Sequence, residues 1–329
     1  MTPVDPAIPG ADWRPTAGIA ALRRRADMLA RAREFFAARA VLEVETPILS
    51  AAAVSDPQIE SLATEVAGLP GRRYLCTSPE FPMKRLLAAG SGDIYQIGKV
   101  FRDGERGRWH NPEFTLIEWY RLGFDDQALM SEVEALAGHL LAPQRALAPA
   151  ERLTYAEALR RHAGVDAHRA SEGELDQAAR RAGVACEADL DHDAKLDLLM
   201  GLVVGPRLGR DRPCFVCDYP ASQAALARLK GGEPPVAARF EFYLDGIELA
   251  NGFHELAHAG EQRARFLGDL AARERMGRPG RPLDERLLAA LAAGMPDCAG
   301  VALGFDRLVA ISLGATRLDE AMAFGIDNA

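Results

Sequence analysis

The chain has 329 residues, of which 48% are apolar and 26% charged, as in soluble globular proteins with one large domain or two modest ones. Its formal net charge of −8 argues against a protein whose main task is to bind nucleic acid, because such proteins neutralise phosphates with an excess of lysine and arginine. The N-terminus has no basic region followed by an apolar core, and the apolar stretch at 198–205 is far too short to span a bilayer, so we expect a cytoplasmic protein without a membrane partner.

The first fifty residues predict an arm, a helix and a strand. Residues 1–18 are rich in proline and predict an arm that lies on the surface. A helix follows, with apolar residues spaced for one face at Leu22, Ala26, Leu29 and Phe36. Residues 41–45 then alternate as a strand, which Thr46 and Pro47 end.

The remaining elements indicate an α+β fold, with an antiparallel β-sheet flanked by helices. Strands joined in hairpins and separated by a long helical stretch favour this arrangement over a doubly wound sheet. Two Ser/Thr-x-x-Glu sequences inside the helical stretch predict capping boxes, at 154–157 and 171–174. The expected elements are strands at 94–102 and 113–121, helices over most of 126–200, strands at 214–218 and 239–250, a helix at 260–276, and a strand-to-helix unit from about Gly300.

Two of the five cysteines, Cys214 and Cys217, form a CxxC sequence. They stand in a β-prone run, where residues three apart point to opposite faces. No second CxxC or histidine pair in the sequence completes a tetrahedral site. We therefore interpret this segment as a buried strand rather than as a zinc or redox site.

Residues 101–114 place an arginine at the end of a strand, before a polar loop. Arg102 ends the strand, and Asp103, Gly104 and Glu105 begin the loop. An arginine beside a mobile basic loop suits a bidentate grip on phosphate. The alternative is an exposed hairpin loop that is merely charged, and the segment alone does not decide between the two.

A second segment predicts a β-hairpin that carries acids. Its turn is the Asp-Gly pair at 245–246, which lets Glu241 and Glu248 face one cavity. Two carboxylates in a pocket need a cation or a proton between them, and Mg²⁺ carried by a triphosphate binds a few carboxylates together with phosphate oxygens. Asn251 and Glu255 are placed to hold a ligand amine. Acids on an exposed hairpin are the alternative, but the apolar residues around them favour a site.

A third segment, at 300–311, runs from an apolar strand through glycine into a helix. Gly304 permits a ligand to approach the backbone closely. Arg307, in otherwise apolar surroundings, needs an anion or Asp306 as a partner, because an unpaired buried charge is costly. A structural Asp–Arg bridge is the alternative to a functional role.

Together, these segments resemble the signature motifs of class II aminoacyl-tRNA synthetases, and their details resemble the lysyl branch. The helix and strand before Pro47 resemble the first motif, 101–114 the second and 300–307 the third. The chain resembles more closely the stand-alone paralogues of lysyl-tRNA synthetase that attach (R)-β-lysine to elongation factor P. The resemblance covers nearly all of the chain from about residue 13. Six short sequences carry it, TSPE at 77–80, MKRLL at 83–87, HNPEF at 110–114, EWYR at 118–121, PASQA at 220–224 and MPDC at 295–298.

The resemblance implies a ligase that converts ATP to AMP and pyrophosphate. It implies a class II synthetase catalytic domain at 19–329, with a helical insertion at about 126–205. Arg102 on the α-phosphate and Arg307 on the γ-phosphate are the implied catalytic residues, and Glu241 and Glu248 the implied Mg²⁺ ligands. The implied ATP-binding residues are Arg102, Asp103, Gly104, Glu105, Glu248, Leu249, Gly304 and Arg307.

For the amino acid, the resemblance implies a pocket whose three acids suit two ammonium groups. Ser78 and Ala302 stand where lysyl-tRNA synthetases usually have alanine and glycine. A methyl or hydroxyl group shifts the preference of a pocket by ~1–3 kcal/mol, and we therefore predict (R)-β-lysine rather than α-lysine as substrate. The implied substrate-binding residues are Ser78, Pro79, Glu80, Asn111, Glu118, Tyr120, Asn251, Glu255 and Ala302.

The same resemblance implies partners. The first motif builds a dimer interface in this class, so we expect a homodimer. Its helix starts near residue 19, which leaves no room for an anticodon-binding domain and, with the negative charge, argues against tRNA as a partner. Two alternatives stay open, a truncated lysyl-tRNA synthetase-like enzyme acting on α-lysine and tRNA, and a non-catalytic regulatory paralogue.

Two departures from the family pattern affect these expectations. The second motif usually reads Arg-x-Glu, but here Gly104 occupies the Glu position and Glu105 follows, so either Glu105 or main-chain groups contact adenine. Ala257 and His258 replace a more usual Thr-Asp pair, and we interpret His258 as a bystander.

Overall fold

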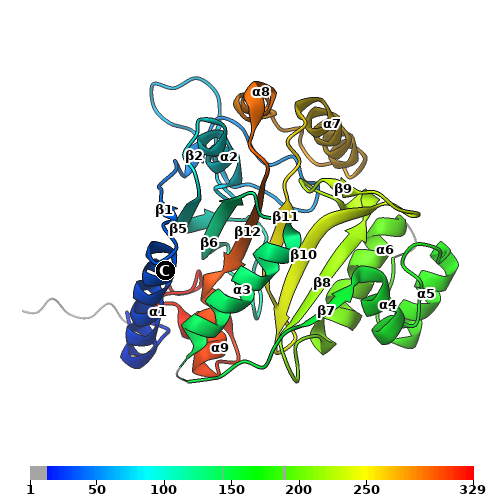
Figure 1. Cartoon of the computed structure of the whole chain (residues 1–329), viewed down its shortest axis with the longest axis horizontal. Coiled ribbons are helices and arrows are strands. Elements are labelled where there is room, and N and C mark those ends of the chain that lie inside the picture. The colour runs from blue at the N-terminus through cyan, green and yellow to red at the C-terminus, as the bar shows by residue number, and fades with distance from the viewer. Residues whose placement is uncertain (1–12, 143, 188–189) are drawn as a thin grey trace, which may run out of the picture.

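A long twisted sheet crosses the molecule, with helices on both of its faces (Figure 1). The computed structural model describes residues 13–142, 144–187 and 190–329. Along the sheet the strands are β1 (Leu42–Glu43), β5 (Ile94–Phe101), β6 (Glu113–Leu122), β12 (Cys298–Gly304), β11 (Ile247–His254), β10 (Val236–Leu244), β8 (Cys214–Pro220) and β7 (Glu151–Thr154), with β9 (Leu229–Lys230) beside β10.

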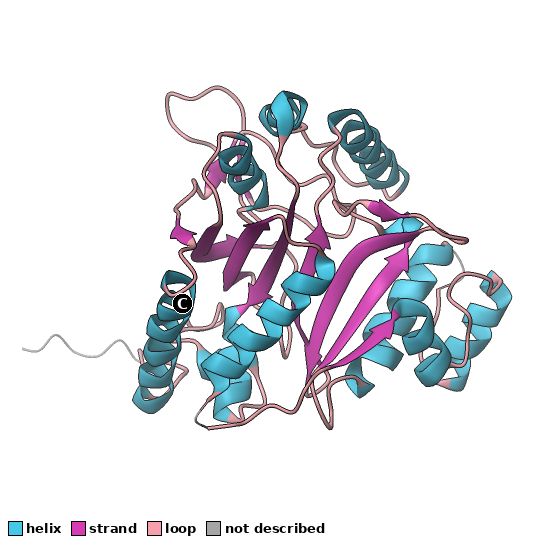
Figure 2. Cartoon of the chain, viewed as in Figure 1, coloured by secondary structure: helices cyan, strands magenta, loops and turns pink. Residues whose placement is uncertain are grey.

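The central pairings of this sheet are antiparallel, and the pairs at its two ends, β1 with β5 and β7 with β8, are parallel. A small sheet of β2 (Leu49–Ser50), β4 (Arg73–Leu75) and β3 (Ala63–Thr64) lies apart from it. The predicted α+β class is confirmed. Figure 2 shows the helices around the sheet, which are α1 (Ile19–Ala37), α2 (Glu80–Ala88), α3 (Asp126–Leu141), α4 (Tyr155–Ala163), α5 (Glu172–Arg181), α6 (His192–Leu199), α7 (Ala259–Arg275), α8 (Glu285–Gly294) and α9 (Phe305–Leu313).

The main hydrophobic core lies between one face of the sheet and the helices α1, α3 and α9. Trp119 of β6 and Phe240 of β10 are fully buried there, and Phe36 of α1 stacks on Tyr95 with ring centroids 4.2 Å apart. Alternation along the strands sends every second side chain to this core. The residues between them point to the opposite face, which leaves that face available for a site.

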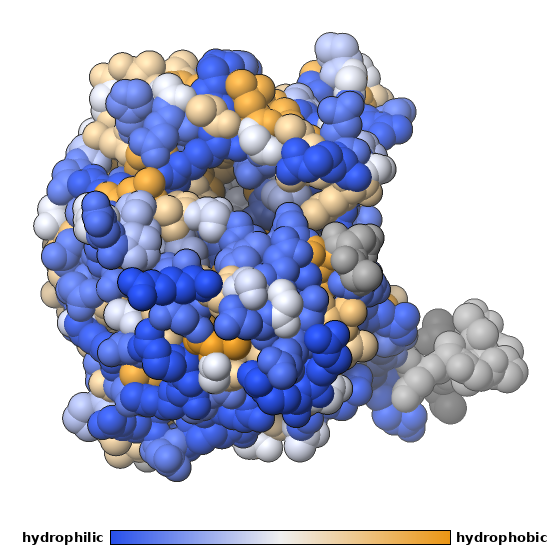
Figure 3. All heavy atoms as spheres, turned by 90° about the vertical axis from the view of Figure 1, so that its right-hand side faces the viewer, coloured by the Kyte–Doolittle hydropathy of each residue, from blue (hydrophilic) through white to orange (hydrophobic). Residues whose placement is uncertain are grey.

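Two smaller cores cover the ends of the opposite face. Helices α4 to α6 pack on β8 around Tyr155, and α2 and α8 pack with Ile94 and Tyr120 around Met83. Figure 3 views the molecule from the side of α4 to α6, where the surface is largely hydrophilic, as expected of helices whose apolar sides face the sheet. The middle of the sheet is left open between the two cores.

Most local predictions are confirmed. Both capping boxes form, and the hairpin turns at Asp245 and Gly246, which have φ of 55° and 77°. Cys214 and Cys217 lie in β8 and pack into cores on opposite faces of the sheet, so they cannot share a metal ion. None of the described helices is long and apolar enough to cross a membrane.

Three predictions differ from the structure, and most of a fourth lies outside the described residues. The buried face of α1 is Met28, Ala32, Phe35 and Phe36, which also repeat at helical spacing, while Ala26 is exposed. The predicted strand at 41–45 is reduced to the two residues of β1. The segment 126–205 is divided, since α3 packs in the main core and β7 joins the main sheet. Most of the predicted arm, residues 1–12, lies outside the described residues.

Candidate active site

A cavity of about 1240 Å³ opens over the middle of the sheet, between the two smaller cores. Glu118, Ala302, Asn251 and Glu241 lie in one register row across β6, β12, β11 and β10. Residues in register on neighbouring strands point to the same face. Four of the predicted site residues, from three distant segments of the chain, are thereby brought side by side.

The next register row contains Tyr120, Gly300, Phe253 and Arg239. A Cβ atom on Gly300 would overlap the ring of Tyr120 and lie 2.5 Å from Glu255 Oε1. Glycine at 300 therefore allows an aromatic ring and a carboxylate to lie directly against the strand.

The start of α2 brings two more predicted residues to this end of the cavity. Ser78 Oγ accepts a hydrogen bond from the Glu80 backbone N–H (3.0 Å) and donates one to Glu118 Oε2 (2.8 Å). The Tyr120 hydroxyl donates to the other Glu118 oxygen, also at 2.8 Å. The Glu118 carboxylate is thus oriented by a hydroxyl on each side.

The carboxylates of Glu80, Glu118 and Glu255 lie at this end of the cavity, which we call the acidic end. Burial, followed by repulsion from Glu80, raises the pKa of Glu118 to about 8. Burial also raises the pKa of Glu255 to about 7, although the nearby Lys84 ammonium opposes this change. Glu255 Oε1 is buried without a hydrogen-bond partner among the described residues. A ligand that carries ammonium groups would relieve all three carboxylates.

The far end of the same face carries the predicted phosphate-binding residues. Arg307, in the first turn of α9, donates hydrogen bonds to the carbonyl oxygens of Glu248 (2.9 Å) and Trp109 (3.1 Å). No carboxylate of the described residues forms an ion pair with it. Its positive charge therefore remains available to an anion.

Asp306 does not pair with Arg307, contrary to one of our expectations. Its carboxylate forms an ion pair with Arg25 of α1 and accepts a hydrogen bond from the Thr115 backbone N–H at 2.7 Å. The two neighbours point apart, since Asp306 is buried between α1 and β6, whereas Arg307 contacts the carbonyl oxygens of Trp109 and Glu248.

A β-bulge places Glu248 among these charges. The register shifts between Phe242 and Tyr243, so that Glu248 pairs with Tyr243 and shares its face. Desolvation and then repulsion by Glu241 raise the pKa of Glu248 to about 7, although the positive charges of Arg307, Arg239 and Arg102 lower it. These charged groups are therefore close enough to act on one another.

The two predicted magnesium ligands differ in their surroundings. Glu241 is held by Arg239 (2.7 Å) and by the Tyr243 hydroxyl (2.5 Å). Within the described residues, the Glu248 carboxylate accepts no hydrogen bond. Two carboxylates beside the predicted phosphate-binding residues would fit Mg²⁺, which uses few protein ligands and takes oxygens from its substrate. Glu248 is the freer ligand of the pair.

Arg102, the other predicted phosphate-binding arginine, lines the cavity. Its guanidinium donates weak hydrogen bonds of 3.4 Å to the Thr77 carbonyl oxygen and to Glu105, and lies 5.1 Å from the centre of the Phe114 ring. Glu105 thus faces Arg102, and Gly104 turns the loop with φ of 77°. Asp103 is held at the start of the loop by main-chain pairing with Glu60.

Not every predicted residue lines the cavity. Pro79 caps the start of α2, and Leu249 is buried in the main core. Gly304 precedes α9, and the atoms nearest to a Cβ added there would lie 3.7 Å away, at ordinary van der Waals contact. The predicted residues that line the cavity are Ser78, Glu80, Arg102, Glu118, Tyr120, Asn251, Glu255 and Ala302.

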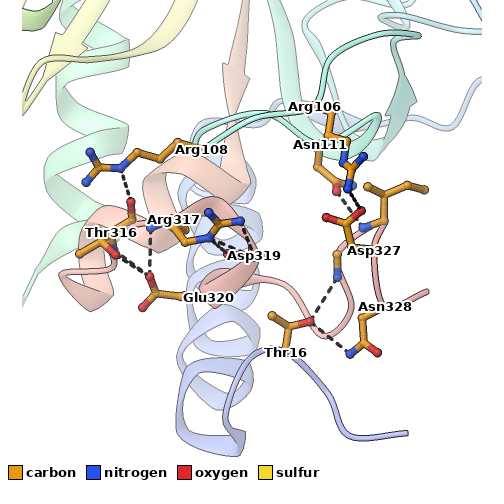
Figure 4. A network of polar contacts seen from close by, with 12 residues as sticks. Thr16, Arg106, Arg108, Asn111, Thr316, Arg317, Asp319, Glu320, Asp327 and Asn328 are labelled. Carbon is orange, nitrogen blue, oxygen red and sulfur yellow. Dashed lines mark hydrogen bonds and ion pairs between the residues drawn. The ribbon is translucent and has the colours of Figure 1, made fainter. Parts of the chain in front are cut away.

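Asn111 is not among the residues that line the cavity, and its contact with substrate stays a prediction. Its amide donates to the Glu113 carbonyl oxygen (2.6 Å), and its oxygen accepts from the Ile326 backbone N–H (2.9 Å). Figure 4 shows it facing the C-terminal segment beside the Arg106–Asp327 ion pair. Its neighbours in sequence belong to a motif, but its side chain holds the chain terminus.

His258 has a local role. Its Nδ1 accepts a hydrogen bond from the Glu261 backbone N–H at 3.0 Å and so caps α7. This agrees with our interpretation of it as a bystander, since capping accounts for its polar contact.

Sequence reasoning missed three residues of the site. Arg239 holds Glu241 and contacts Asn251, and its alternation with Glu241 on one strand was an available signal. Lys84 stands four residues after Glu80, the spacing of a helical ion pair. Nothing local distinguishes Gly300, because the ring and the carboxylate against it come from other strands.

Comparison with known proteins agrees with this architecture. The family model described as tRNA synthetases class II (D, K and N) matches residues 11–328. A protein of Vibrio cholerae named elongation factor P–(R)-β-lysine ligase is 51% identical over 97% of this chain and 99% of its own length. Proteins of the same name from Yersinia enterocolitica and Mannheimia succiniciproducens are 48% and 47% identical over 97% and 96% of this chain, and 99% and 98% of their own lengths.

An antiparallel sheet with a charged cavity on one face and three ordered motifs defines a class II synthetase catalytic fold. Within that class, the chain belongs to the family of elongation factor P–(R)-β-lysine ligases.

Proposed function

We propose that this chain activates (R)-β-lysine with ATP and transfers it to a lysine side chain of elongation factor P. The observation that carries the proposal is the acidic end of the cavity, where Glu80, Glu118 and Glu255 surround space for two ammonium groups. The names of the relatives support both the amino acid and the acceptor.

In the first step, an oxygen of the substrate carboxylate attacks the α-phosphorus of ATP, and pyrophosphate leaves. Such a transfer is accelerated mainly by alignment of the reacting atoms and by positive charge near the phosphates. Arg102 would hold the α-phosphate and Arg307 the γ-phosphate, and Gly304 leaves room for the nucleotide beside the backbone. Glu241 and Glu248 would hold Mg²⁺, which neutralises charge on the phosphates.

In the second step, the neutral amine of the acceptor lysine attacks the carbonyl carbon of the adenylate. AMP leaves, and the amine loses a proton as the amide bond forms. Ser78 and Tyr120 keep Glu118 oriented toward the substrate during both steps. Ala302, in register between Glu118 and Asn251, narrows the floor of the cavity by one methyl group relative to glycine.

We also propose a cytoplasmic homodimer that pairs through α1 and β1. Exposed apolar residues on these elements, Ile19 and Leu42, support the proposed interface. Sedimentation of the purified chain would test it, and a monomer at micromolar concentration would contradict it.

Intact mass measurement of elongation factor P tests the proposed reaction. Incubation with this chain, ATP, Mg²⁺ and (R)-β-lysine is expected to add the mass of one lysyl residue. Aminoacylation of tRNA with α-lysine, in the absence of that gain, would favour a truncated lysyl-tRNA synthetase-like enzyme. No gain and no pyrophosphate exchange with either amino acid would favour a regulatory paralogue.

A further inference from the structure

A lysine is buried directly behind the acidic end of the cavity. Lys84 stands on α2, one turn after Glu80, and its side chain is 1% exposed. Its Nζ lies 2.7 Å from Glu80 Oε1 and 2.6 Å from Glu255 Oε2. Glu80 and Glu255 line the cavity, whereas Lys84 does not. The ammonium therefore contacts the carboxylates of Glu80 and Glu255 from the protein interior, while both residues also border the cavity.

Packing alone does not explain a charged residue at this position. Burying an ammonium is costly, and an apolar side chain of the same length fills the same volume without that cost. The other buried residues of α2 are Met83 and Leu87, which belong to a hydrophobic core, and a methionine at 84 would extend that core. What the ammonium adds is charge and two fixed contacts.

The Lys84 ammonium changes the net charge of the acidic end, which the surrounding groups determine. The groups that face Lys84 and Glu255 are Glu80 on α2, Glu118 and Tyr120 on β6, Cys298 on β12 and Arg228, whose carboxylate partner is Asp297. Three carboxylates with one ammonium leave two negative charges at this end when all are ionised. That number equals the positive charges of an amino acid with two ammonium groups.

Lys84 also acts on Glu255 in particular. Of the groups around Glu255, its ammonium is the strongest influence that lowers the pKa of this carboxyl, against burial and the charge of Glu80. Neither oxygen of Glu255 has a hydrogen-bond partner among the described residues, but Oε2 forms the ion pair with Lys84, whereas Oε1 lies against Gly300. Lys84 thus holds one oxygen of Glu255 and leaves the other to a ligand.

We propose that Lys84 is a positioning residue for amino-acid activation, which keeps Glu255 ionised and fixed at the back of the pocket so that its free oxygen accepts a substrate ammonium. This inference rests on the proposed function, because it assumes that the cavity binds an amino acid with two ammonium groups. It gives the lysine of the MKRLL sequence a part in binding rather than in the helix alone.

The test is the pH dependence of amino-acid KM in ATP–pyrophosphate exchange, measured from pH ~6 to ~9 for the wild type and for Lys84→Met. Each unit by which a carboxyl pKa rises weakens binding about tenfold below that pKa. We expect KM of Lys84→Met at neutral pH to rise about tenfold or more, its curve to move to higher pH, and KM for ATP to stay the same. Lys84→Arg retains the charge, so its curve should keep the wild-type midpoint even where its KM is changed.

A KM that rises equally at every pH in Lys84→Met would show a merely structural role and overturn the proposal. Where that variant does not fold, Glu80→Gln combined with Lys84→Met removes an acid with the cation, and the curve should again move to higher pH. An unmoved curve in the double variant would equally overturn it. If wild-type exchange responds to α-lysine and not to (R)-β-lysine, the proposed substrate is wrong, and the Lys84 comparison is then made with α-lysine.

Discussion

The ring of Tyr120 lies against the backbone of Gly300 on the neighbouring strand, where a Cβ atom would overlap it. The same space brings Glu255 Oε1 against the strand. The acidic end of the cavity therefore depends on one missing methyl group in the floor of the sheet.

Replacing Gly300 by alanine should displace both side chains. Overpacking of this kind costs about 1–3 kcal/mol of unfolding free energy. Because Glu118 is held by Tyr120, the amino-acid KM in pyrophosphate exchange should rise by more than about tenfold, while nucleotide affinity measured by calorimetry stays the same.

Gly268→Ala is a matched control for that change. Gly268 lies within α7 and no atom would come within 4 Å of an added Cβ atom. It should slightly raise the melting temperature and leave both KM values unchanged. Wild-type amino-acid KM in Gly300→Ala would contradict the placement of the substrate against Tyr120.

The raised pKa values of Glu118 and Glu255 predict a pH dependence of amino-acid binding. With pKa values of about 8 and about 7, these carboxyls hold protons at low pH in the empty cavity. Ammonium groups bind the ionised forms, so binding releases protons, and amino-acid KM should fall as pH rises from about 6 to about 8.5. Steady-state pyrophosphate exchange across this range measures it.

Glu118→Gln should remove the upper part of that dependence. The amide oxygen can still accept a hydrogen bond from one of the two hydroxyls of Ser78 and Tyr120, and the amide NH2 can donate to the other, but the group has no charge to titrate. The variant should bind more weakly at pH ~8 and show a flatter curve above pH ~7. An unchanged pH dependence of amino-acid KM would show that a group other than Glu118 titrates.

Arg307 is expected to act on ATP rather than on stability. Its guanidinium contacts two carbonyl oxygens, so that Arg307→Gln breaks no ion pair with any described residue and should change the melting temperature little. Loss of a fixed positive charge at the phosphates should lower the rate of pyrophosphate exchange by about 10²–10³-fold.

Arg317→Gln provides the comparison for Arg307→Gln. Arg317 is exposed and pairs with Asp319 on the surface. Pyrophosphate exchange should keep its wild-type rate in the Arg317→Gln variant. Equal losses in the two variants would show that the effect is one of overall charge and not of position.

Local patterns predicted most of the fold. The strand expected at 94–102 is Ile94–Phe101, and the helix expected at 260–276 is Ala259–Arg275. Alternation, caps and turn residues are properties of neighbouring residues, and these can be identified from one sequence. The face of α1 was less predictable, because two sets of apolar residues in this helix, one with Ala26 and one with Met28 and Ala32, both follow helical spacing.

The partners of the site residues were harder to predict, because they depend on distant segments. Asp306 pairs with Arg25, which is far away in sequence, and not with the adjacent Arg307. The bulge that turns Glu248 toward Glu241 has no sequence signal as clear as the Asp-Gly turn. The roles in ATP and magnesium binding come from resemblance and remain predictions.

Asn111 shows how a residue within a matched motif can do something other than bind substrate. It accepts a hydrogen bond from the Ile326 backbone N–H, while Arg108 donates to the Thr316 carbonyl oxygen at 2.6 Å (Figure 4). The C-terminal segment is thereby fastened to the loop that follows Arg102.

Asn111→Ala should release this segment and loosen the loop. Loss of these part-buried hydrogen bonds costs about 1–3 kcal/mol of unfolding free energy, and amide hydrogen exchange at 316–329 and 103–110 should become faster. KM for ATP should rise while KM for the amino acid stays the same, because Arg102 borders the loop and the acidic end does not. Asp327→Asn, which weakens only an exposed ion pair with Arg106, should leave both constants unchanged. A higher amino-acid KM in Asn111→Ala, with wild-type amide hydrogen exchange at 316–329, would instead support the substrate contact that the resemblance implies.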